Sequence, residues 1–172
     1  MVFILSEDGR DEDFPNGVKI AFERYNNYLK QNEAAFPPRA YELATSNWFY
    51  NPGDHRAPHD SWLESCQISE TQERKGNRRS CSVSLRLLGA YHDGHIEIIY
   101  PKVFSYTLLN LKPGEVTSHG DWRYDEFRLS ERGNLIHEIE WAGAPGAHRK
   151  SFLWVIEADD IDFRWIPAES GS

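Results

Sequence analysis

The sequence has few of the residues on which disulfide-rich, membrane-spanning or nucleic-acid-binding proteins depend. Only two of its 172 residues are cysteine, which is too few for a disulfide framework. It has no apolar run of membrane-spanning length. Lys and Arg number 19 against 27 for Asp and Glu, and the net charge of −8 is opposite to that of a nucleic-acid-binding surface. We therefore expect a soluble protein that binds neither nucleic acid nor membrane.

The common catalytic signatures are also missing. The chain has no Gly-x-Ser-x-Gly elbow, no Walker loop and no Gly-x-Gly-x-x-Gly fingerprint. His137-Glu138 begins like a zinc-protease motif, but Trp141 stands where the second histidine belongs. These absences favour a non-enzymatic protein without a cofactor.

The features that are present indicate a folded cytoplasmic domain. Aromatic residues make up 13% of the chain and hydrophobic residues 40%, which is typical of a globule with a substantial core. The length predicts one domain over 1–172. The apolar start Met1–Leu5 is shorter than a signal peptide and is followed by acids, so we expect a cytoplasmic location. The oligomeric state is left open.

Hydrophobic periodicity predicts one helix followed by strands. Apolar residues recur at spacings of three and four over 16–35, which indicates an amphipathic helix, and Pro37-Pro38 ends it. Residues 39–61 show no clear period. From about residue 62 the period changes to two, which indicates strands. The predicted strands are 62–69, 79–91, 95–109, 121–130, 134–142, 151–157 and 161–166.

This pattern predicts an α+β fold that is mainly antiparallel β. About seven short strands over 62–166 would form a meander or a sandwich, with the N-terminal helix packed on it. If the first two strands form a hairpin, Cys66 and Cys81 fall nearly opposite each other, and we expect both to be reduced thiols in a cytosolic protein.

The candidate surface for a partner protein combines aromatic and acidic residues. The segment Trp48-Phe49-Tyr50 lies beside a turn, where complete burial is difficult, although core packing is the alternative. Acidic runs lie near both ends of the chain and are either solvated faces or a means of steering a basic partner. The acids assigned to this surface are Asp11, Glu12, Asp13, Asp159 and Asp160.

The alternative function is binding of a carbohydrate or another small ligand, with carboxylate-dependent hydrolysis as an extension. Paired acids can act as general acid and base, and nearby tryptophans can stack on sugars. A polar outer sheet face would explain the same acids without a function. The residues of this alternative are Trp122, Asp125, Glu126, Glu138, Glu140 and Trp141.

A metal-dependent enzyme is a third hypothesis. The segment Asp54–Asp60 holds two histidines and two acids, and His119 could approach from another loop. Imidazole and carboxylate ligands suit zinc, which would make His55, His59 and His119 the ligands. Asp and His are also ordinary turn residues, so we expect no metal.

The middle of the chain resembles a known family. His59-Asp60-Ser61-Trp62 enters the first predicted strand, a second follows over 81–88, and the apolar run Ile96 to Tyr106 follows that. Over about 59–110 this order is similar to small bacterial β-rich proteins grouped among the predicted immunity proteins of polymorphic-toxin systems. The resemblance implies a cytoplasmic protein that neutralises a toxin by binding it, and it implies no catalytic residues. The acidic charge of the chain would suit a basic toxin.

Overall fold

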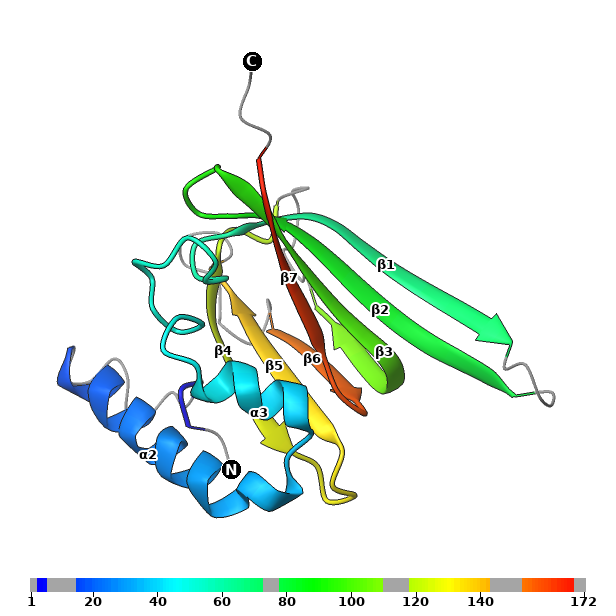
Figure 1. Cartoon of the computed structure of the whole chain (residues 1–172), viewed down its shortest axis with the longest axis horizontal. Coiled ribbons are helices and arrows are strands. Elements are labelled where there is room, and N and C mark those ends of the chain that lie inside the picture. The colour runs from blue at the N-terminus through cyan, green and yellow to red at the C-terminus, as the bar shows by residue number, and fades with distance from the viewer. Residues whose placement is uncertain (1–2, 6–14, 73–77, 110–117, 143–152, 169–172) are drawn as a thin grey trace.

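The computed structural model describes residues 3–5, 15–72, 78–109, 118–142 and 153–168. These residues form two α-helices, a short 3-10 turn and seven antiparallel strands, which confirms the predicted α+β class (Figure 1). Among them, no helix has the length and hydropathy needed to cross a bilayer.

The predicted N-terminal helix is present. Helix α2 spans Asn16–Asn32, a 3-10 turn η1 follows at Glu33–Ala35, and the residues buried along α2 include Ala21, Tyr25 and Leu29 at a spacing of four. Their spacing puts them on one face of the helix.

A second helix was not predicted. Helix α3 spans Pro38–Thr45 and buries Ala40, Leu43 and Ala44. The Pro37-Pro38 pair, which was expected only to end a helix, also starts one, because proline fits the first turn, where its missing N–H has no intrahelical partner.

Each predicted strand range overlaps one observed strand, because alternation is a local property of the sequence. The strands pair in the order β1-β2-β3-β6-β5-β4, with β7 also beside β3. The chain therefore makes one meander through β1, β2 and β3, crosses to the far edge, and returns through β4, β5 and β6. The strands are β1 Trp62–Gln72, β2 Arg79–Leu88, β3 Gly94–Leu108, β4 Trp122–Leu129, β5 Leu135–Trp141, β6 Leu153–Ala158 and β7 Asp162–Pro167.

Strand β3 joins the two halves of the sheet. Its first half pairs with β7, Gly94 opposite Pro167, and its second half pairs with β6, Val103 opposite Ala158. Strands β6 and β7 are therefore one long strand interrupted at 159–161. Gly94 is required where β7 crosses, because a Cβ there would lie 2.4 Å from the Trp165 ring.

The sheet curls until its two edge strands meet at one end. Trp62 at the start of β1 bridges to Asp121, just before β4. The amide of Trp122 donates to the carbonyl of Ser61 at 2.9 Å, and the amide of Asp60 donates to the carbonyl of Trp122 at 2.8 Å. At the other end the β1–β2 hairpin projects away from the helices (Figure 1).

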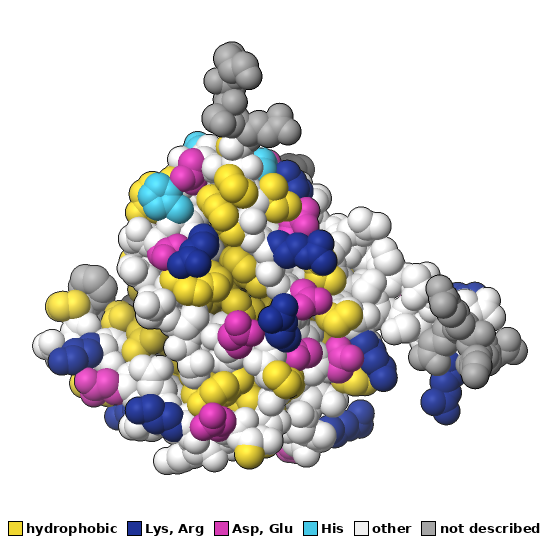
Figure 2. Space-filling model, in the orientation of Figure 1, with side chains coloured by type: hydrophobic (Ala, Val, Ile, Leu, Met, Phe, Trp, Pro, Cys, Tyr) yellow, Lys and Arg dark blue, Asp and Glu magenta, His cyan; other side chains and the backbone are white. Residues whose placement is uncertain are grey.

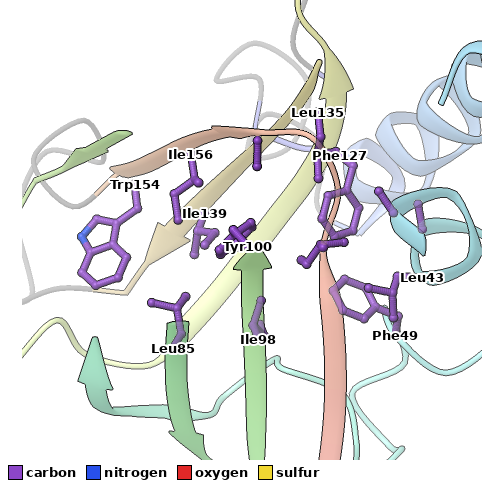
Figure 3. Packing of buried hydrophobic residues seen from close by; sticks show 14 of the residues in the cluster. Leu43, Phe49, Leu85, Ile98, Tyr100, Phe127, Leu135, Ile139, Trp154 and Ile156 are labelled. Carbon is purple, nitrogen blue, oxygen red and sulfur yellow. The ribbon is translucent and has the colours of Figure 1, made fainter. Parts of the chain in front are cut away.

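The hydrophobic core lies inside this curl and beneath the helices. Figure 3 shows Leu85, Ile98, Ile139 and Trp154 directed toward a common interior from four different strands. Phe49 packs beside Phe127, with ring centroids 5.6 Å apart. Complete burial of each large side chain contributes roughly 1.5–3 kcal/mol, so this cluster stabilises the curled sheet and fixes its loops.

The prediction that the two cysteines lie nearly opposite each other is wrong. Cys66 lies opposite Leu85 and Cys81 lies opposite Glu70, and both thiols are free. The pairing is continuous from Gln72 opposite Arg79 to Ser65 opposite Arg86, so the position of the connection between the two strands sets the register at both cysteines. That position has no clear sequence pattern.

Candidate functional site

The aromatic segment predicted to contact a partner is largely part of the fold. Phe49 is only 1% exposed. Trp48 lies between the Phe163 ring, at 5.0 Å, and the Arg56 guanidinium, at 4.7 Å. The Tyr50 hydroxyl lies 3.3 Å from that of Tyr25. Contacts within the fold therefore hold this segment in place, and little of it is free to contact a partner.

The acids assigned to the partner surface have different surroundings. Asp11, Glu12 and Asp13 lie outside the described residues. The Asp160 carboxylate accepts the amide protons of Arg39 and Ala40 at 3.1 and 3.0 Å, which caps the start of α3. Asp159 is exposed and accepts the amide of Asp160 at 2.9 Å. Of this acidic pair, Asp159 is the one that faces solvent.

The six residues of the ligand-binding alternative are divided between the two faces of the β4–β5 hairpin. A register shift between Trp122 and Tyr124 puts Trp122 on the same face as Asp125. On β5, Glu138 and Glu140 lie two residues apart and therefore share the other face, where Glu126 of β4 lies opposite Glu138. The inner face carries Trp122, Asp125 and Trp141, and the outer face carries Glu126, Glu138 and Glu140. The predicted set therefore does not converge on one site.

On the outer face the acids hold the start of the chain. One Glu126 oxygen accepts the amides of Phe3, Ile4 and Leu5 at 2.9, 2.8 and 3.3 Å. Its other oxygen lies 3.0 Å from Arg128, which also binds Glu138. Burial raises the pKa of Glu126, although these partners oppose the shift. The arrangement is that of a structural anchor.

On the inner face a chain of hydrogen bonds runs through the core. The Tyr100 hydroxyl lies 2.6 Å from Nδ1 of His137. Nε2 of His137 lies 3.0 Å from one oxygen of Asp125, and the Trp122 indole donates to the other at 3.0 Å. All four side chains are buried. Asp125 is thus the end of a fully bonded polar network.

The histidines proposed as metal ligands are in three separate contacts. His55 stacks on Tyr91, His59 Nδ1 lies 3.1 Å from an Asp60 oxygen, and the His119 ring is 5.5 Å from that of Trp141. Burial lowers the pKa of His119. Within the described ranges, no three His, Cys, Asp or Glu side chains gather as metal ligands. The described part of the structure therefore does not bring His55, His59 and His119 together as one set of ligands.

The end of the molecule where the sheet closes carries two exposed aromatic side chains. Trp62 is 50% exposed and Tyr91 is 48% exposed. The Tyr91 hydroxyl donates to the carbonyl of Pro52 at 3.0 Å, and its ring stacks on His55 at 4.0 Å. The Trp62 ring lies 4.7 Å from that of His92. We call Trp62, Tyr91, His55 and His92 the aromatic end. Figure 2 shows histidine side chains gathered at this end.

The backbone beside Trp62 is held in an unusual conformation. Asp60 and His92 have φ values of 62° and 57°, and they are the non-glycine residues with positive φ in the described part of the chain. Asp and His tolerate this region better than most residues, but it persists only where the surroundings enforce it. Asp60 lies two residues before Trp62, and the His92 ring contacts the Trp62 ring. Trp62 is therefore exposed on a rigid support.

A hollow of about 430 Å³ adjoins Trp62. Its lining includes Leu63, His119 and Asp121. A side chain of a partner protein can enter such a hollow and pack against the exposed Trp62 ring.

Comparison with protein-family models, curated proteins and solved structures finds no match to this chain.

Sequence reasoning did not select Trp62 or Tyr91. Tyr91 precedes the short turn His92-Asp93-Gly94, where a side chain has little to pack against, and this pattern was available. Trp62 starts a strand, and alternation alone cannot distinguish an aromatic residue at an uncovered sheet end from one in the core.

Proposed function

We propose that this protein is a non-enzymatic, cytoplasmic binding protein that neutralises a partner protein by occluding it, with the aromatic end as its contact surface. The observation that carries the proposal is the rigid exposure of Trp62 and Tyr91. Trp and Tyr are enriched among the residues that dominate binding energy at interfaces. Because neighbours already fix both rings, little side-chain freedom is lost on binding.

The charge of the chain supports a basic partner. The net charge is −8, and at least one member of the predicted acidic run, Asp159, faces solvent. A negative field speeds encounter with a positively charged protein and weakens with salt. Together with the resemblance to bacterial immunity proteins, this favours a basic toxin as the partner.

The test is neutralisation of a toxin by the full chain. Candidate toxins encoded beside the gene are expressed in cells with and without this protein, and growth is measured. We expect rescue by the wild type and binding that weakens as salt rises. Failure of every neighbouring candidate to be neutralised would exclude the immunity role.

The contact surface is tested with single variants. Trp62→Ala and Tyr91→Ala are each expected to weaken binding by about 2 kcal/mol, or roughly thirtyfold. Tyr106→Ala is the matched control, because Tyr106 is 46% exposed but lies in the half of β3 that pairs with β6. Unchanged affinity in a folded Trp62→Ala, Tyr91→Ala double variant would show that the partner binds elsewhere.

A further inference from the structure

A cavity of about 190 Å³ lies between the start of α2, the loop after α3 and the start of β4. Its walls are mainly aromatic rings, including Phe22, Tyr50, Trp122 and Tyr124. Phe22 and Tyr50 meet edge to face, with centroids 5.4 Å apart. A cavity of about 150 Å³ holds a benzene molecule, so this one has room for a small organic ligand.

One wall of the cavity is formed by Asp125, which is 3% exposed. Burial raises the pKa of Tyr100 well above its ordinary value, so its hydroxyl keeps its proton and can donate to Nδ1 of His137. With Nδ1 as the acceptor, Nε2 of His137 donates to Asp125. The Trp122 indole donates to the other oxygen. Both oxygens of the carboxylate thus have a hydrogen bond, and in this tautomer neither donor carries a formal charge.

The basic side chains that line the cavity, Arg123 and His59, lie near acids other than Asp125. Arg123 Nε lies 3.8 Å from Glu140, and His59 Nδ1 lies 3.1 Å from Asp60. The acids near Arg123 and His59 are therefore Glu140 and Asp60, and Asp125 is the acid among the residues that line the cavity.

The neighbouring tyrosine is affected by this charge. The pKa of Tyr50 is raised well above its ordinary value, first by burial and then by Tyr25, Asp125 and Glu126. Burial, the largest cause, disfavours charge of either sign, but the contributions of Asp125 and Glu126 come from negative charge, which favours a cation near the Tyr50 oxygen.

We propose that this cavity binds a small organic ammonium ion, with its cationic head against the aromatic rings and directed toward Asp125. Aromatic faces attract alkylammonium groups, and the attraction grows where water is excluded. The carboxylate adds charge complementarity, whereas the mainly apolar walls offer little to a sugar. This site uses two residues of the predicted ligand set, Trp122 and Asp125, and is independent of the aromatic end.

The experiment compares three ligands of nearly equal shape on the full chain. Choline carries the charge, 3,3-dimethylbutanol is its neutral isostere, and 3,3-dimethylbutanoate is an anion of similar size. The Trp122 indole N–H resonance reports binding, because this group donates to Asp125. We expect a saturable shift with choline at millimolar concentration, binding of the alcohol weaker by about tenfold, and no shift with the anion.

Two variants test whether choline binds in this cavity. Asp125→Asn keeps the size of the side chain and removes its charge, so the preference for choline over the alcohol should disappear. Phe22→Leu removes one ring of the wall on a half-buried helix position and should weaken choline several-fold, even if Asp125→Asn does not fold. Tyr106→Leu is the control outside the cavity and should change nothing. Equal binding of the alcohol, preferred binding of the anion, no saturable shift with choline, or unaltered choline binding by folded Asp125→Asn or Phe22→Leu would each overturn the proposal.

Discussion

Several acidic side chains of this protein are used to complete the fold. Asp160 closes the start of α3, Glu126 gathers the amides of residues 3–5, and Glu138 binds Arg128. Figure 2 shows acidic and basic side chains interspersed on the face in view. The net charge of the sequence therefore overstates the number of acids available to a partner.

Replacing Asp160 should weaken α3. Its carboxylate accepts the same helix amides that an N-cap side chain would accept, and the cap position itself is Pro37, which has no such side chain. We expect Asp160→Ala to lower the free energy of unfolding by about 1 kcal/mol, measured by urea denaturation. Asp159→Ala is the control and should have little effect. Equal stability of both variants would contradict the capping role.

The buried Glu126 should make stability depend on pH. Burial raises its pKa above the ordinary value of 4.5. For a group whose pKa is raised on folding, the stabilisation is complete below the unfolded pKa and is lost as pH rises through the folded pKa. Relative to Glu126→Gln, the wild type should therefore lose free energy of unfolding between about pH 4.5 and neutrality.

Glu157→Gln provides a control of opposite sign. Its hydrogen bond with Asn134 is the main cause that lowers the pKa of Glu157. A lowered pKa stabilises the fold above the unfolded pKa and loses that effect as pH falls. Relative to this variant, the wild type should gain stability as pH rises. Parallel stability curves for wild type and Glu126→Gln would refute the first prediction.

Among the elements, α2 covers the exposed edge of β4 with tyrosine hydroxyls. The Tyr25 hydroxyl accepts the amide of Phe127 at 2.7 Å and donates to its carbonyl at 3.1 Å. The Tyr28 hydroxyl accepts the amide of Leu129 at 2.9 Å. An uncovered edge strand would offer these groups to another chain. The helix therefore replaces a missing neighbouring strand.

Removing the Tyr25 hydroxyl should show how much the edge of β4 depends on it. Tyr25→Phe leaves a buried backbone N–H and C=O without that partner, so we expect a loss of about 1–3 kcal/mol in the free energy of unfolding. Faster hydrogen exchange at the Phe127 amide should accompany it. Tyr106→Phe, on an exposed side chain, is the control. A loss no greater than that of the control would mean that water or another group satisfies the edge.

The elements differ in how well the sequence predicts them. The strands follow from alternation, which is local. Helix α3 does not, because its start is completed by Asp160 from a distant turn. The prediction that Cys66 and Cys81 face each other was wrong because the position of the hairpin connection decides the register, and no local pattern marks that position. Asp125 and Glu126 were both predicted as ligand residues, but consecutive residues of a strand point to opposite faces of the sheet, so they do not share one site.

For the whole molecule, the decisive feature is the curl of the sheet. Contact between the starts of β1 and β4 encloses the core and leaves Trp62 at an uncovered rim. This closure decides that Trp122 is buried and that Trp62 is exposed. Because closure joins residues far apart in the chain, no local pattern reveals it.

The curl of the sheet also predicts that local stability differs along the strands. Ile96 and Ile98 lie in the part of β3 that pairs with both β2 and β7, and both are fully buried. Residues 70–72, in the projecting hairpin, are exposed. Native-state hydrogen exchange should therefore show the slowest amides near Ile96 and Ile98 and the fastest strand amides near 70–72. Uniform protection along the hairpin would contradict this gradient.

The interrupted strand β6–β7 has a consequence for synthesis on the ribosome. Strand β3 emerges well before residues 153–167, which form its second neighbour. Until that last stretch is made, the nascent chain presents an apolar strand with one side unpaired, a form prone to association with other chains. Holdase chaperones are expected to bind the growing polypeptide in this interval and to leave it once the C-terminal stretch has been translated.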